Sequence, residues 1–316
     1  VSRVLNKRPD VNEDTRGRVM EVIERYGYEP NSNAKHLKQL STDCVAVIVR
    51  GRNNLFFSGI LELLQKRIEA AGLRFLPHYI DENDDEAAAA LRVYAERKVR
   101  GIIFMGGCHT DNGAMLSRLP IPCVYSTVNA AEGYAPNVSS VSVDDRQGAK
   151  KAVDYLFDCG HENMVILSGE TQGCNMAHQR YLGVLDSFKE HGKTLESSRV
   201  LVSPFSFSCA YERIKEYTGP DYTAIFAMSD TMAIGAARAL MDSGKRVPED
   251  VSVIGYDGIE LAQYYHPALA TMRQPQQELA DRSVELLLES MDTDCAPKHI
   301  QLETELIQGA SVKHIS

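Results

Sequence analysis

Short apolar runs that alternate with helical patterns fill the chain from residue 43 onward, and no other feature constrains the fold as strongly. Apolar, β-favouring runs stand at 45–49, 101–105, 164–167, 224–227 and 251–255, and helical patterns separate them. A strand that is apolar on both faces needs cover on each side, and helical connections bring successive strands together in parallel. The sequence therefore predicts an α/β fold with two doubly wound parallel-sheet subdomains.

The order of these elements sets the subdomain boundaries. A first series of strands and helices ends near residue 160, and a second series follows it. We expect the last helix, over 276–291, to return to the first series and to tie the two subdomains together. The predicted subdomains are residues 43–160 plus 274–303, and residues 161–273 plus 304–316.

A small basic head precedes this body. Residues 1–40 carry eight Lys and Arg against six Asp and Glu, a net charge of +2, whereas the whole chain carries −9. The asymmetry places any contact with nucleic-acid phosphates at the N-terminus. Asn12 begins a predicted helix that runs to Tyr26, and apolar residues 1, 4 and 5 stand at helical spacing before it. Two helices do not make a core, so we expect residues 1–30 to be part of a headpiece with a further helix upstream.

The segment from Gly27 to Asp43 joins the head to the body. Gly27 closes the preceding helix and Pro30 prevents its continuation, while the Asn and Ser residues that follow offer a cap for a new helix over about 33–40. So short a helix is unstable alone in water. We interpret residues 31–42 as a hinge helix that folds only when something holds it; the alternative is an ordinary interdomain linker.

Composition excludes several classes of protein. No apolar run reaches the roughly 18 residues that span a bilayer, and the polar start is not a signal peptide, so we expect a cytoplasmic protein without a membrane partner. Seven scattered cysteines without a CxxC pair predict small buried side chains rather than disulfides or zinc. We find no P-loop, GxGxxG, HExxH or GxSxG motif, and therefore predict no catalytic residue, no metal and no cofactor. His161 is interpreted as a turn residue, and Asp85 and Glu86 as a solvated helix start.

Polar and aromatic residues follow several of the predicted strands. In open α/β sheets a ligand binds beyond the carboxyl ends of the strands. The sequence there places residues 50–57, Gly106 and Gly107, Asp144 and Asp145, Ser229 and Asp230, and Tyr256 and Asp257. Carboxylates, an amide and aromatic rings suit a polyhydroxylated ligand such as a sugar, and Arg180 could add a bidentate donor. The alternatives are that Asp144, Asp230 and Asp257 cap helices or turns and that Phe56 and Phe57 are core.

Several motifs together resemble a bacterial LacI/GalR-type transcriptional regulator over essentially the whole chain. They are Val1-Ser2-Arg3-Val4-Leu5-Asn6, Gly27-Tyr28-x-Pro30-Asn31, Asn54-Leu55-Phe56-Phe57, Gly160-His161, Arg180-Tyr181-x-Gly183, Ser229-Asp230-x-Met232-Ala233-Ile234-Gly235, Val253-Ile254-Gly255-Tyr256-Asp257 and His266-Pro267-Ala268-Leu269. The resemblance implies a helix-turn-helix headpiece, a hinge helix and a periplasmic-binding-protein-like core that dimerises and binds a small effector.

The resemblance also implies individual roles. DNA-contacting positions would be Ser2, Arg3, Asn6, Asn31, Ala34 and Leu37, with Leu37 as the hinge leucine that wedges into the minor groove. Effector-contacting positions would be Phe56, Phe57, Asp145, Arg180, Phe205, Ser229, Asp257 and Gln274. The sequence departs from the family pattern at Leu55, where Pro is usual, at Ser229, where Asn is commoner, and in the first headpiece helix, which is absent. The chain also stops without a leucine-heptad tail, which favours a dimer over a tetramer.

The leading hypothesis is a repressor that binds a pseudo-palindromic operator DNA as a homodimer and responds to a small carbohydrate effector. One alternative within the same family is a catabolite-control regulator whose corepressor is a phosphorylated protein. An alternative from another class is the solute-binding receptor of a transporter, which would share the α/β core but has no use for a basic head and a hinge.

Overall fold

A computed structural model of the chain describes residues 12–26, 43–51, 54–82, 84–107, 112–130, 133–172, 176–293 and 295–315. The chain divides into two compact units, residues 1–41 and residues 42–316. In the first unit the described part is α2 (Glu13–Tyr26), and the backbone N–H of Thr15 donates to Asn12 Oδ1 over 2.8 Å. The helix predicted between Asn12 and Tyr26 is thereby confirmed. The expected hinge helix lies outside the described residues.

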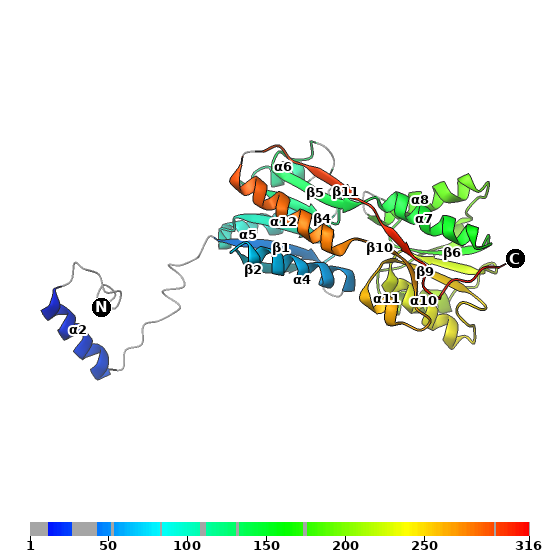
Figure 1. Ribbon diagram of the computed structural model, residues 1–316, viewed down its shortest axis with the longest axis horizontal. Helices are drawn as coiled ribbons and strands as arrows, with labels where there is room; N and C mark the ends of the chain where they lie inside the picture. The colour runs from blue at the N-terminus through cyan, green and yellow to red at the C-terminus, as the bar shows by residue number, and fades with distance from the viewer. Residues whose placement is uncertain are drawn as a thin grey trace. The chain divides into compact units, whose positions relative to one another are not determined.

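The second unit contains two six-stranded sheets (Figure 1). The first sheet has the order β11-β5-β4-β3-β1-β2, and all its neighbouring strands pair in parallel. Its strands are β1 (Cys44–Arg50), β2 (Arg74–Ile80), β3 (Gly101–Met105), β4 (Cys123–Ser126), β5 (Val138–Val143) and β11 (His299–Leu302). The predicted α/β class and parallel pairing are confirmed here.

The second sheet has the order β12-β10-β9-β8-β6-β7. Its strands pair in parallel except for the edge pair β10 and β12, which is antiparallel. The strands are β6 (Met164–Ser168), β7 (Val200–Val202), β8 (Ala224–Ala227), β9 (Ser252–Asp257), β10 (Ala270–Arg273) and β12 (Glu305–Ile307). Because β11 joins the first sheet and β12 the second, the C-terminal segment contributes to both. The exact subdomain boundaries remain a proposal.

Helices cover both faces of the first sheet. Val45, Val47 and Val49 of β1 belong to the core cluster that contains α4 (Leu55–Ala70) and α12 (Gln276–Asp292), whereas Ala46 and Ile48 pack with α5 (Glu86–Arg97). A strand alternates its side chains between the two faces, so a run without polar residues is what two helical layers require. A short helix, α6 (Gly113–Leu116), lies near α5.

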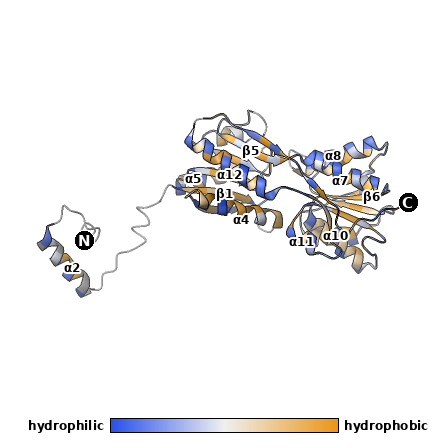
Figure 2. Cartoon of the chain, in the orientation of Figure 1, coloured by the Kyte–Doolittle hydropathy of each residue, from blue (hydrophilic) through white to orange (hydrophobic). Residues whose placement is uncertain are grey.

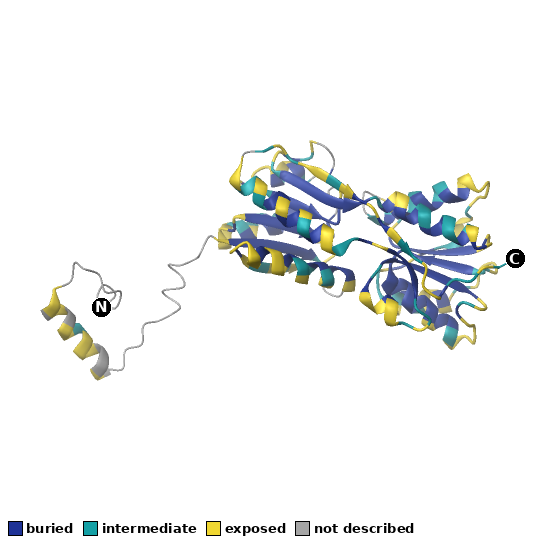
Figure 3. Cartoon of the chain, viewed as in Figure 1, coloured by how far each residue is buried: buried dark blue, intermediate teal, exposed yellow. Residues whose placement is uncertain are grey.

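The second sheet is layered in the same way. Met164 and Ile166 pack with α7 (Asp145–Asp158) and α8 (Met176–Glu190), while Val165 and Leu167 belong to the cluster that contains α9 (Phe207–Lys215) and α10 (Asp230–Asp242). Figure 2 shows β1 and β6 as apolar bands, and Figure 3 shows buried strands flanked by helices whose outer faces are exposed. The remaining elements are α11 (Glu260–Tyr264) and a 3₁₀ turn at Ser197–Arg199. No helix in the described ranges is long and apolar enough to cross a membrane.

Two smaller predictions change in the structure. His161 is fully buried; its Nδ1 lies 2.9 Å from Thr223 Oγ1 and its Nε2 lies 3.0 Å from the Lys313 carbonyl oxygen, so it ties the C-terminal segment to the second sheet. Cys44, Cys123 and Cys159 are buried as predicted, but Cys209 and Cys295 are partly exposed. Burial raises the pKa of the Cys123 thiol to about 12, which fits an inert core residue.

Candidate functional site

A cavity of about 970 Å³ lies at the carboxyl ends of strands from both sheets. Arg50 ends β1 and Gly51 follows it, Gly106 and Gly107 follow β3, and Gly169 follows β6, while Asp257 ends β9. The other described lining residues are Asn54, Phe56, Phe57, Glu82, Asp84, Asp85, Asn112, Glu170, Met176, Ala177, Arg180, Val202, Ser203, Pro204, Phe205 and Ser206. The edge of the sheets at which the sequence predicted a ligand therefore borders a hollow of ligand size.

Two phenyl rings reach the cavity because glycines leave room for them. A Cβ on Gly106 would stand 2.5 Å from Phe57 Cε2, and one on Gly169 would stand 2.4 Å from Phe205 Cε2. Each ring therefore lies directly against the backbone that follows a strand. Asn54 Oδ1 caps α4 by accepting from the N–H groups of Phe56 and Phe57 over 3.0 and 3.3 Å, which fixes the start of that helix. Phe56 and Phe57 belong to the hydrophobic core, as the alternative interpretation predicted, and they also line the cavity.

Arg180 anchors a buried ionic network behind the cavity. Its Nε donates to Asp145 Oδ1 over 2.7 Å, its Nη1 donates to the Met228 carbonyl oxygen, and its Nη2 lies 3.5 Å from Asp257 Oδ1. The guanidinium carbon also lies 3.7 Å from the centre of the Tyr256 ring. Arg180 has 2% of its surface exposed, and breaking such a desolvated network from one side leaves a buried charge without its partner.

Asp257 has a strained backbone conformation and a side-chain pKa that is raised above its ordinary value. Its φ of +112° lies in a region that residues with a side chain seldom adopt, and such strain concentrates at functional sites. Its Oδ1 accepts from Gln274 Nε2 over 2.8 Å, while its Oδ2 accepts no hydrogen bond from the described residues. Burial raises the pKa of this carboxyl to about 7, and the Arg180 charge opposes that rise. Burial likewise raises the pKa of Asp145, against the same guanidinium.

The eight candidate effector residues occupy three kinds of position. Five of them line the cavity, namely Phe56, Phe57, Arg180, Phe205 and Asp257. Asp145 and Gln274 stand behind it and hold Arg180 and Asp257. Ser229 is the N-cap of α10, with its Oγ accepting from the Met232 N–H over 3.1 Å, and it does not line the cavity. The side chain of Asp144 caps α7 in the same manner, as its capping alternative predicted.

The prediction of a solvated helix start at Glu86 is wrong. Glu86 is 1% exposed; its Oε1 accepts from the Tyr125 hydroxyl over 2.6 Å and its Oε2 from Arg50 Nη2 over 2.9 Å. Gly107 makes room for this carboxylate, since a Cβ there would stand 2.6 Å from Glu86 Oε2. The run Ala87–Ala90 is the signal that could have found it, because small side chains at a helix start allow close packing. Asp85 does cap the helix, accepting from the Ala87 and Ala88 N–H groups.

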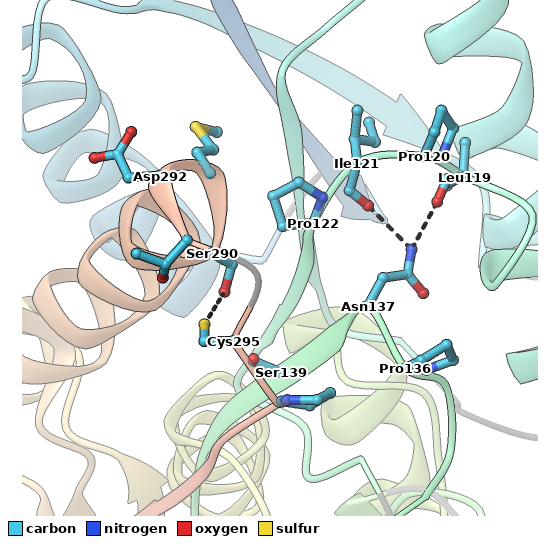
Figure 4. A pocket seen from close by; sticks show the side chains of 13 residues that line it. Leu119, Pro120, Ile121, Pro122, Pro136, Asn137, Ser139, Ser290, Asp292 and Cys295 are labelled. Carbon is cyan, nitrogen blue, oxygen red and sulfur yellow. Dashed lines mark hydrogen bonds between the residues drawn. The ribbon is translucent and has the colours of Figure 1, made fainter.

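A second hollow, of about 400 Å³, lies where the segments before β4 and β5 meet the end of α12 (Figure 4). Asn137 Nδ2 donates there to the carbonyl oxygens of Leu119 and Ile121 over 3.1 and 3.0 Å, so its amide donor already serves the fold. Of the described residues that line this hollow, Asp292 is the one with a charge. The larger cavity carries far more of the groups that recognise a polar ligand.

The six candidate DNA-contacting residues, Ser2, Arg3, Asn6, Asn31, Ala34 and Leu37, lie outside the described residues. Their roles therefore remain predictions.

Comparison with known proteins places the chain among bacterial regulators. A family model described as "Bacterial regulatory proteins, lacI family" matches residues 1–31, and one described as "Periplasmic binding protein-like domain" matches residues 153–312. The chain is 32% identical to the HTH-type transcriptional regulator MalR of Clostridium butyricum, over all of this chain and 95% of that protein. It is 31% identical to the HTH-type transcriptional repressor PurR of Vibrio vulnificus, with the same coverage.

A solved structure supports the same assignment. The complex of the transcriptional regulator CelR with cellobiose superposes with a TM-score of 0.76 at 27% identity, covering 98% of this chain and 94% of that one.

Proposed function

Since the chain belongs to the LacI family of bacterial regulatory proteins, we propose that it is a transcriptional repressor whose affinity for operator DNA is set by a small polyhydroxylated effector. The observation that carries this proposal is the pair of Arg180 and Asp257 at the cavity, backed by Asp145 and Gln274. The molecule acts in the cytoplasm on DNA, and we assign it no catalytic step.

The cavity offers what a sugar needs. Asp257 Oδ2 is an open acceptor for a hydroxyl, and Arg180 has five N–H groups, more than its contacts with Asp145, Met228 and Asp257 use. A diol presents a donor and an acceptor side by side, which matches a carboxylate next to a guanidinium. The rings of Phe57 and Phe205 offer flat apolar surfaces for the C–H face of a sugar ring.

Strand β1 offers a route from the cavity to the DNA-binding segment. It begins at Cys44, just after the hinge residues 31–42 in the chain, and ends at Arg50 in the cavity wall. A ligand that changes how the two sheets close on the cavity would therefore change how each subunit presents its hinge. A short hinge helix needs a partner to fold, so withdrawing its support lowers operator affinity.

We assign the regulator a homodimeric state, because two headpieces on a two-fold axis read the two halves of a pseudo-palindromic site. Sedimentation at micromolar concentration should give twice the monomer mass. A monomer at that concentration, together with an operator that lacks two-fold symmetry, would contradict the assignment.

A thermal-shift screen of sugars and nucleobases tests the effector class. A ligand that binds only the folded protein stabilises it by RT ln(1 + [L]/Kd), or about 2.7 kcal/mol at one hundred times Kd. We expect at least one sugar to raise the melting temperature and Arg180→Ala to abolish that rise. A rise with a nucleobase and with no sugar would favour a purine-type effector. Operator binding that requires a phosphorylated carrier protein would instead favour the catabolite-control alternative.

A further inference from the structure

The charged side chains around the cavity are strongly unbalanced. Two guanidinium groups, Arg50 and Arg180, face five carboxylates among the described lining residues, namely Glu82, Asp84, Asp85, Glu170 and Asp257. A ligand that enters the cavity therefore meets a predominantly negative wall.

Each guanidinium is already paired with a carboxylate of the protein, so its positive charge is compensated before a ligand binds. Arg180 lies between the buried carboxylates of Asp145 and Asp257. Arg50 pairs with Glu86 over 2.9 Å, and its Nη1 donates to the Glu82 carbonyl oxygen. Glu86 is buried and is itself held by the Tyr125 hydroxyl over 2.6 Å, so this pair is fixed rather than a passing surface contact.

The remaining carboxylates have no cationic partner among the described residues. Glu82, Asp84, Asp85 and Glu170 form no ion pair with any Lys or Arg that the structure describes. Three of these carboxylates accept hydrogen bonds from backbone N–H groups: Asp84 accepts from Asp81, Asp85 from Ala87 and Ala88, and Glu170 from Gln172. Such contacts leave the negative charge of each carboxylate in place.

We propose that the cavity selects an uncharged sugar and rejects phosphorylated or carboxylated sugars of the same shape. The inference rests on the proposed function and narrows its ligand class. An anionic group would face unpaired carboxylates, and to gain an ion pair it would have to displace Glu86, Asp145 or Asp257 from a guanidinium. Like charges brought together, without a free cation to compensate, are an effective means of rejecting a ligand. A hydroxyl group, in contrast, can donate to the same carboxylates.

Matched sugar pairs test the proposal directly. Calorimetry would compare cellobiose with cellobiose 6'-phosphate, ribose with ribose 5-phosphate, and glucose with gluconate, all at low ionic strength. We expect at least one uncharged sugar to bind and its anionic counterpart to bind about 100-fold more weakly, with the ratio shrinking as salt screens the exposed carboxylates. An anionic sugar that binds as tightly as its parent overturns the inference. A panel in which no sugar of either kind binds overturns the proposed function itself.

Three variants locate the source of the discrimination. Glu86→Gln frees the charge of Arg50, and Glu170→Gln removes one exposed carboxylate; each should raise the affinity for the anionic sugar relative to its parent by about 10-fold. Glu62→Gln makes the same chemical change on the exposed face of α4, outside the cavity lining, and should leave that ratio unchanged. Equal ratios in all three variants and the wild type would overturn the inference. Arg52 lies outside the described residues, so Arg52→Gln is tested as well. If the wild type binds the anionic sugar tightly and Arg52→Gln does not, Arg52 is the cation that binds the anion, and the inference is overturned.

Discussion

Replacing Asp257 by Asn should remove a pH-dependent part of the stability. The amide can still accept from Gln274 and Arg180, and Asn tolerates a positive φ better than most residues, so the fold should persist. The variant lacks the ionisable carboxyl group, so the protonation of residue 257 no longer contributes to the pH dependence of stability. A folded-state pKa of about 7 instead of 3.8 corresponds to about 4 kcal/mol of differential free energy between the protonation states.

Asp257 stabilises the folded protein most at low pH, because its pKa is raised on folding. Because the folded-state pKa lies above the unfolded one, the folded protein holds this proton more tightly. The contribution of Asp257 to the free energy of unfolding is therefore fully present below about pH 4 and is lost as the pH rises to about 7. The wild type loses this contribution between pH 5 and pH 8 and Asp257→Asn does not. The free energy of unfolding of the variant minus that of the wild type should therefore rise by about 3 kcal/mol from pH 5 to pH 8.

Urea unfolding at pH 5, 6, 7 and 8, followed by circular dichroism, measures this difference. Asp158→Asn is the matched control. Asp158 is an exposed residue of α7, so this substitution makes the same chemical change away from the cavity. Its free energy of unfolding should follow that of the wild type at every pH. A gap between Asp257→Asn and the wild type that stays constant within about 0.5 kcal/mol from pH 5 to pH 8 would refute the assignment of the buried titration to Asp257.

Three further predictions concern the cavity and the hinge. Arg180→Ala should weaken effector binding by roughly 2 to 5 kcal/mol in calorimetry, because it leaves desolvated carboxylates unpaired, and unchanged affinity would remove Arg180 from the site. Gly106→Ala should destabilise the protein more than Gly72→Ala does in urea unfolding: both glycines have positive φ, but only Gly106 has the Phe57 ring at 2.5 Å from the added Cβ, so equal losses would contradict the packing argument. Leu37→Ala should severely weaken operator binding while leaving effector affinity nearly intact, and a variant with wild-type affinity in a gel-shift titration would disprove the hinge-wedge mechanism.

The layered fold follows from the sequence where each strand is apolar on both faces. β1, β3, β6 and β8 are of this kind, and the residues at the ends of β1, β3 and β6 lead directly to the cavity wall. The apolar pattern reveals β5 poorly, because Ser139, Ser140 and Ser142 interrupt it although all three are buried in the sheet. α11 is too short for its five residues to show a helical period.

The site was harder to predict than the fold, for a physical reason. Strand ends indicate which residues face the cavity, but the pairing of charges depends on tertiary contacts between distant residues. Glu86 and Tyr125 are 39 residues apart, and Arg180 reaches Asp145 across 35 residues. No local pattern announces the positive φ of Asp257 either, because the conformation is imposed by the surrounding structure.

The central claim is that a ligand in this cavity controls the affinity of the protein for DNA. The most direct measurement is a fluorescence-anisotropy titration of the full regulator against an operator that it has selected from random-sequence DNA, with and without a sugar that the thermal-shift screen identifies. We predict that the sugar changes operator affinity by at least about tenfold, which is about 1.4 kcal/mol of coupling, and that Arg180→Ala binds the operator but no longer responds to the sugar. Operator affinity that is identical with and without saturating sugar, or a full response in Arg180→Ala, would contradict the claim.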